Sequence, residues 1–92
     1  MKTERMLEKL KDILSAERHA QLEKYTSLKK VLKALRVEKR KFAERLENES
    51  DEDKRKEIAS RLKVISRQRK KGLNVLKELK EERDKKPATK RK

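Results

Sequence analysis

The sequence predicts an all-α fold: an antiparallel two-helix coiled-coil hairpin with unequal arms, packing as a dimer or a four-helix assembly. Ala, Glu, Lys, Leu and Arg fill 62 of the 92 positions, well above the roughly 50% typical of coiled coils and long helices. One Gly and one Pro leave few points at which a helix must end. Apolar residues recur at intervals of seven along two segments, which indicates two helices that share a seam.

The first helix is predicted over residues 2–47. Its apolar line has one residue per heptad, with Gln21 filling the one polar position: Leu7, Leu14, Leu28, Leu35 and Phe42. Further apolar side chains flank this line at Leu10, Tyr25, Val31, Leu32 and Leu46. This spacing is that of a helix with one apolar face and excludes a strand.

A turn is predicted over residues 48–50. Asn48 can end a helix in the left-handed conformation, and Ser50 with Asp53 approximates a capping box. The acidic residues Asp51 and Glu52 suit the positive end of a helix dipole. A single continuous helix is the alternative, because neither Gly nor Pro interrupts the chain here.

The second helix is predicted over residues 51–84, and Pro87 ends it. Its apolar line is interrupted in the middle and reads Ile58, Leu62, Ile65, Arg69, Gly72, Leu76 and Leu79. Residues 85–92 are expected to form a disordered basic tail.

A turn centred near residues 49 and 50 places residue n opposite residue 99 − n. Phe42 then faces Ile58, and Leu28 lies near Gly72. The single glycine either admits Tyr25 and Leu28 close to the backbone or is a tolerated small residue.

The longer first helix leaves residues 1–14 without an intramolecular partner. An exposed apolar stripe marks an interaction site, and a lone two-helix hairpin has little core. Both points predict a homo-oligomer, against the alternative that this overhang frays. The predicted oligomer interface combines the overhang with a nearly neutral flank of the hairpin: Met6, Leu7, Leu10, Ile13, Leu14, Val31, Val64 and Val75.

The net charge of +14, from 31 basic and 17 acidic residues, is unevenly distributed. Residues 25–43 carry +6 and residues 54–71 carry +8, whereas residues 44–53 at the predicted tip carry −5. Helical projection at about 100° per residue gathers cations of both helices on one side of the seam. The predicted polyanion face comprises Lys29, Lys33, Arg36, Arg40, Lys56, Lys63, Arg67, Lys70 and Lys77.

Two interpretations of that face are open: a polyanion-binding surface and the solvated surface of a lysine-rich helix. One Tyr and one Phe argue against base stacking on aromatic platforms. Nucleic acid would therefore be bound through phosphates, without sequence specificity. The alternative function is an assembly or adaptor coiled coil that binds an acidic protein, with no nucleic-acid role.

Several classes of site are excluded or unsupported. The chain has no Cys and a single His, so thiolate chemistry is excluded, and His19 with Glu23 is too small a set for a metal. No glycine-rich phosphate loop occurs. We expect no enzyme activity, no cofactor, no metal and no small-molecule substrate. No apolar run reaches the roughly 20 residues of a membrane span. An intracellular, cytoplasmic location is expected, and nuclear import by the basic tail is left open.

Overall fold

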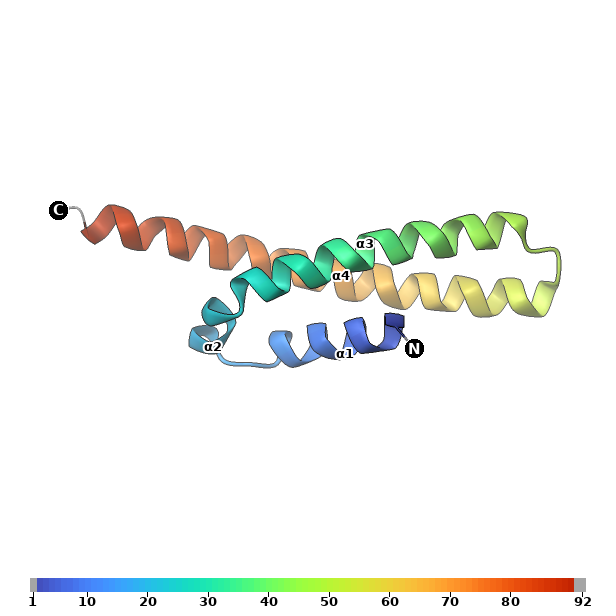
Figure 1. Cartoon of the computed structure of the whole chain (residues 1–92), viewed down its shortest axis with the longest axis horizontal. Coiled ribbons are helices and arrows are strands. Elements are labelled where there is room, and N and C mark those ends of the chain that lie inside the picture. Colours follow the sequence, from blue (N-terminus) through green and yellow to red (C-terminus); the bar gives the residue numbers. More distant parts are fainter. Residues whose placement is uncertain (1, 91–92) are drawn as a thin grey trace.

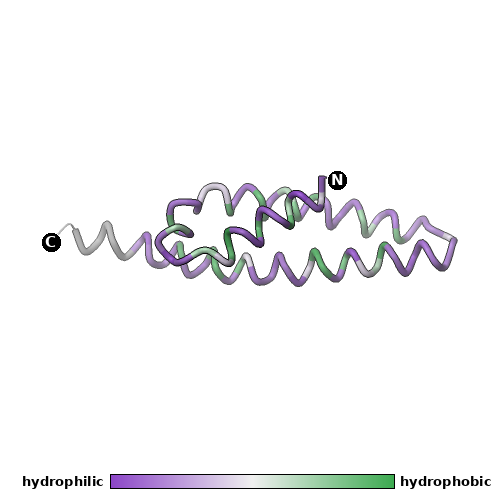
Figure 2. Tube along the Cα trace, turned by 90° about the horizontal axis from the view of Figure 1, so that it is seen from below, coloured by the Kyte–Doolittle hydropathy of each residue, from purple (hydrophilic) through white to green (hydrophobic). Residues whose placement is uncertain are grey.

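The computed structural model describes residues 2–90, and the side chains of residues 2–84. This part of the chain forms four helices and no strand: α1 (Lys2–Leu14), α2 (Arg18–Glu23), α3 (Tyr25–Asn48) and α4 (Glu52–Lys90). The predicted all-α class is confirmed. Figure 1 shows α3 and α4 running antiparallel along an elongated molecule, with α1 lying beside the middle of the pair. The hydrophilic residues dominate the end of the pair that carries the α3–α4 turn (Figure 2).

The continuous helix predicted over residues 2–47 is wrong between α1 and α3. The chain reverses direction after Leu14, and the side chain of Gln21 supplies a donor to the carbonyl groups at the end of α1. Gln21 Nε2 donates to the carbonyl oxygens of Ile13 at 3.1 Å and Leu14 at 3.2 Å. Gln21 is only 6% exposed, as its place on the heptad line indicates. The heptad spacing did not indicate that its side chain caps the end of α1.

The predicted overhang is therefore folded back, and α1 packs against both α3 and α4. Leu10 and Ile13 are 0% and 2% exposed and share one core with Leu28, Leu35 and Ile65. A third helix buries apolar surface that a two-helix hairpin would leave in water, which favours the folded-back arrangement.

Gly72 of α4 faces side chains of both α1 and α3. A Cβ atom at this position would lie 2.6 Å from Leu32 Cδ2 and 3.1 Å from Leu10 Cδ1. The glycine therefore serves close approach, but the approaching side chains are not the predicted Tyr25 and Leu28. Leu32 lies about one helical turn further along α3, and Phe42 and Ile58, which were predicted to face each other, line one hollow near the turn.

The turn between α3 and α4 covers residues 49–51, and Asp51 rather than Ser50 caps α4. Asp51 Oδ1 accepts hydrogen bonds from the backbone N–H groups of Asp53 at 2.9 Å and Lys54 at 3.4 Å. No left-handed residue ends α3, since Glu49 has φ −90° and ψ 125°. Instead Arg55 Nη1 donates to the carbonyl oxygens of Leu46 at 2.6 Å and Glu49 at 2.9 Å.

The second helix does not end at residue 84 as predicted, because α4 continues to Lys90. The basic tail predicted over residues 85–92 falls on side chains that lie outside the described part of the chain.

Candidate polyanion-binding face

The α3–α4 pair has two flanks, and α1 occupies one of them. On α4, Arg61 and Val64 lie on the flank next to α1, which we call the covered flank. At about 100° per residue, Leu62, Ser66 and the neighbouring cations lie on the opposite side of the seam, which we call the open flank. This division decides which charged side chains are free to meet a partner.

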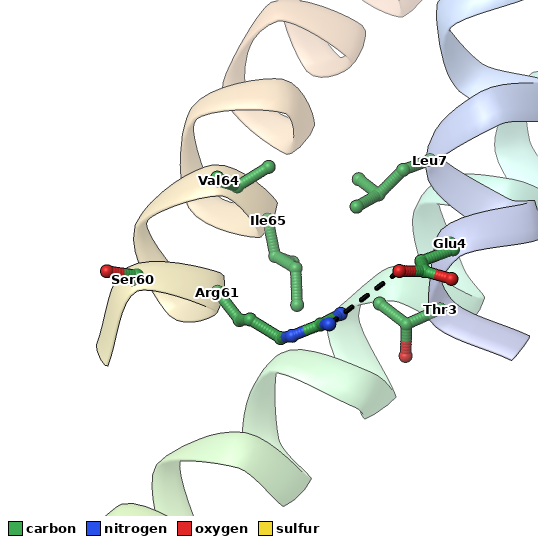
Figure 3. A pocket seen from close by; sticks show the side chains of 7 residues that line it. All are labelled: Thr3, Glu4, Leu7, Ser60, Arg61, Val64 and Ile65. Carbon is green, nitrogen blue, oxygen red and sulfur yellow. Dashed lines mark ion pairs between the residues drawn. The ribbon is translucent and has the colours of Figure 1, made fainter. Parts of the chain in front are cut away.

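On the covered flank, α1 supplies polar and apolar contacts to α3 and α4. Figure 3 shows Thr3, Glu4 and Leu7 of α1 facing Arg61, Val64 and Ile65 of α4. Arg61 Nη2 lies 3.6 Å from Glu4 Oε2. Thr3 Oγ1 donates to Glu38 Oε1 of α3 at 2.8 Å. These contacts fix the N-terminal end of α1 to both helices of the pair.

The residues predicted as an oligomer interface contact one another within one chain instead. Leu10, Ile13 and Val31 are buried in the chain's own core. Met6, Leu7, Leu14 and Val75 are half-buried and pack against that core, while Val64 remains 47% exposed. Within one chain, the turn at residues 15–17 brings the apolar overhang onto the neutral flank, and an interface between chains stays a prediction.

The open flank carries a shallow groove between α3 and α4. Its centre is apolar and its rim is cationic, and the lining residues are Lys39, Ala43, Leu46, Ala59, Leu62, Lys63, Ser66, Arg67 and Lys70. Three cations of the predicted polyanion face, Lys63, Arg67 and Lys70, line this groove. Side chains from both helices therefore meet on one side of the seam.

The remaining residues of the predicted polyanion face are all exposed: Lys29, Lys33, Arg36, Arg40, Lys56 and Lys77. By helical spacing, the four from α3 lie on the same side of that helix as Lys39 and Ala43. The groove adds Lys39, which the sequence analysis missed. Lys39 follows Leu32 by one heptad, and a long lysine stem at such a flanking position can cover apolar surface while its ammonium group stays in water.

In the middle of the α3–α4 pair, carboxylates are segregated from this face. Glu38 is the only acidic residue in the range 25–43, and Glu57 is the only one in the range 54–71. Glu38 is bonded to Thr3 of α1, and Glu57 lines a hollow with Lys2 and Thr3. Both carboxylates thus belong to the covered flank. Over these two ranges, every charged side chain of the open flank is a cation.

None of the cations of the polyanion face takes part in an ion pair among the described side chains. The ion pairs that form across the helices involve other arginines, such as Arg18 with Glu78 at 2.7 Å and Arg61 with Glu4. Lys29 Nζ lies 5.7 Å from the centroid of the Tyr25 ring. The positive charge of the open flank is therefore available to an external anion.

Comparisons of the chain with protein-family models, curated proteins and solved structures found no match.

Other candidate sites have little support in the described residues. His19 Nε2 lies 3.6 Å from Glu23 Oε2 on an exposed surface, and the described residues contain no group of three or more side chains able to hold a metal ion. The Tyr25 ring is covered by Arg83, whose Cζ lies 4.1 Å from the ring centroid. Within the described part of the chain, no helix is both long and apolar enough to cross a membrane.

Proposed function

We propose that this protein is a non-enzymatic helical interaction protein that binds a polyanion, such as duplex nucleic acid, through the polyanion face and without sequence specificity. The platform is the antiparallel α3–α4 pair. The observation that carries the proposal is the segregation of charge. Both carboxylates of residues 25–43 and 54–71 lie on the flank that α1 covers, which leaves an unneutralised cationic surface opposite.

The binding energy would come from phosphate neutralisation and counterion release. Within the face, like charges stand four residues apart at Lys29 and Lys33, and again at Lys63 and Arg67. Each such pair costs about 0.2–0.5 kcal/mol in an isolated helix. A bound polyanion removes this repulsion, so binding and helix stability support each other.

Sequence-specific readout is not part of the proposal. Base recognition uses amide or guanidinium groups presented at a groove edge, and Gln68, which lies between Arg67 and Arg69, is half-buried. The charged residues that line the groove of the open flank are three lysines and one arginine. These groups suit phosphate oxygens of any sequence.

The test is duplex DNA binding measured from about 50 to 200 mM salt. If about five cations each neutralise one phosphate, log K falls against log salt with a slope of about −4.5. The triple variant Lys63→Glu, Arg67→Glu, Lys70→Glu should lower affinity by roughly a hundredfold or more and reduce the magnitude of the slope by about 3. The matched control Lys9→Glu, Lys30→Glu, Lys71→Glu changes net charge equally at exposed positions outside the polyanion face. Equal losses in the two variants would overturn the proposal.

A second candidate function is the binding of an acidic protein helix, and the apolar centre of the groove favours it. Ala43, Leu46 and Leu62 lie between the rim cations, an arrangement that suits an amphipathic helix with acidic edges. In that case DNA binding would be negligible near 150 mM salt while an acidic amphipathic peptide still binds. We also propose that the protein self-associates through its apolar α1 residues, as the sequence predicts.

A further inference from the structure

The α1–α2 connection is a turn that the sequence does not require. The line Leu7, Leu14, Gln21, Leu28, Leu35 and Phe42 keeps one heptad phase across the turn. No Gly or Pro occurs in residues 1–48, and no described residue adopts a positive φ. A chain with an uninterrupted heptad and no helix breaker can also form one straight helix over this range.

The backbone hydrogen bonds show which residues must change partners for this segment to form one straight helix. Ser15 N donates to Lys11 O at 3.0 Å, and Gln21 N donates to Glu17 O at 2.9 Å, both in the helical i to i−4 pattern. A second break lies at Lys24, between α2 and α3, where the backbone has φ −99° and ψ 18°. The amides from residue 16 to residue 20 and from residue 25 to residue 27 would need new partners.

Straightening would also return two carbonyl groups to their ordinary partners. In the folded-back form, Ile13 O and Leu14 O accept from Gln21 Nε2. In a continuous helix they would accept from the N–H groups of Glu17 and Arg18, four residues on. The exchange leaves no buried carbonyl unpaired, so both forms satisfy the backbone.

We propose that two copies of this chain exchange α1 by straightening the turn at residues 15–17 and the break at Lys24, so that each α1 lies on the covered flank of the other copy. Every contact of α1 with α3 and α4 would be kept, now between chains. These include the hydrogen bond from Thr3 to Glu38 and the Glu4–Arg61 ion pair shown in Figure 3. Such domain swapping is a low-cost route to a dimer because the interface already exists in the monomer.

The pairing of Thr3 with Glu38 also fixes the symmetry of this dimer. If these residues meet between copies, residue n of one long helix lies opposite residue 41 − n of the other. The two long helices are then antiparallel, and the twofold axis passes beside Ala20 and Gln21. The arrangement closes on itself with two copies, as a twofold interface requires.

The proposal is tested by cross-linking, since the chain has no native cysteine. Thr3→Cys and Glu38→Cys are made in separate copies, mixed, refolded together at high protein concentration and treated with a short thiol–thiol cross-linker. Exchange predicts a covalent dimer from the mixture and none from either variant alone, because equivalent residues would lie roughly 50 Å apart along the two helices. A mixture that gives no covalent dimer overturns the proposal.

Glu17→Pro provides a second test in the otherwise unchanged chain. Glu17 has φ −70° and ψ 164°, a φ that proline adopts, and its N–H donates no hydrogen bond within the described residues. In the straight helix, proline would remove the bond to Ile13 O and clash with that carbonyl. Sedimentation should show a dimer association constant lower by at least about a hundredfold, whereas the control Glu17→Ala keeps or raises it.

A dimer that forms equally well with Glu17→Pro and Glu17→Ala contradicts exchange and indicates side-by-side association. Circular dichroism of each variant checks that the helices are retained. If Glu17→Pro fails to fold, the cross-linking result alone decides, because it uses the native turn.

Discussion

The two flanks of the α3–α4 pair differ in both charge and partner. The covered flank holds the acidic residues Glu38 and Glu57 and meets α1. The open flank holds cations from both helices around an apolar centre. The two carboxylates in the middle of the pair therefore lie on the side where the chain folds onto itself. The opposite side, which we propose to bind a partner, carries only cations among its central charged residues.

Burial also separates Glu38 of the covered flank from the cations of the open flank. Glu38 has a side chain only 13% exposed and receives a hydrogen bond from Thr3, whereas the cations that rim the groove are exposed. A carboxylate placed on the open flank would neutralise neighbouring ammonium groups and weaken attraction to an anion. The covered flank thus serves folding, and the open flank is the surface we assign to binding.

The largest contrast in stability is expected between a leucine of α1, which packs on the covered flank, and a leucine of the open flank. Leu10→Ala should lower the free energy of unfolding by about 2–5 kcal/mol, because Leu10 is 0% exposed and its loss leaves a cavity. Leu62→Ala removes a half-buried side chain in the open groove and should cost about 1 kcal/mol. Urea unfolding followed by circular dichroism measures both, and equal losses would contradict the division into flanks.

Gln21→Ala should have the next largest effect. The change removes the side-chain donor to Leu14 O, at a cost of about 1–3 kcal/mol for an unpaired group, while Ile13 O keeps the N–H of Ala16 at 3.2 Å. Thermal unfolding of this variant should begin at lower temperature, and hydrogen exchange should be faster in α1 than in α4. Unchanged exchange in α1 would show that Gln21 does not hold the turn.

Asp51→Ala tests a contact that lies beyond both flanks, at the turn. Loss of the cap on the N–H groups of Asp53 and Lys54 should cost about 0.5–2 kcal/mol. Ser50→Ala is the matched control and should cost less, because Ser50 was predicted from the sequence to cap α4 but Asp51 does so. A larger loss from Ser50→Ala would reverse this assignment.

The smallest effect is expected at Arg61, whose ion pair with Glu4 spans the edge of the covered flank. The side chains are 40% and 58% exposed, so Arg61→Ala should cost at most about 1 kcal/mol. The loss should shrink further at 1 M salt, where surface charges are screened. A salt-independent loss would indicate that packing of the arginine stem dominates.

Local patterns in the sequence were sufficient for the helical class and for most of the core. Leu28, Leu35 and Ile65 were placed on the seam by heptad spacing and are buried. The exposed cations of the polyanion face were found in the same way, because helical projection depends only on short-range geometry.

The return of α1 could not be predicted from the same patterns. The heptad continues through Gln21 in both the straight and the folded-back arrangement, so periodicity does not distinguish them. The choice depends on tertiary contacts, namely the burial of Leu10 beside Gly72 and the capping of α1 by a side chain seven residues beyond its end. Lys39 was missed because its backbone lies close to the seam while its side chain lines the groove of the open flank.

The most direct test of the central claim is lysine footprinting of the protein bound to duplex DNA at about 150 mM salt. Acetylation followed by mass spectrometry compares lysines of the open flank with exposed lysines elsewhere in one experiment. We predict protection of Lys39, Lys63 and Lys70, with Lys9, Lys30 and Lys71 reacting as in the free protein. Uniform protection of all six, or protection of the second set alone, would show that net charge rather than the open flank binds the polyanion.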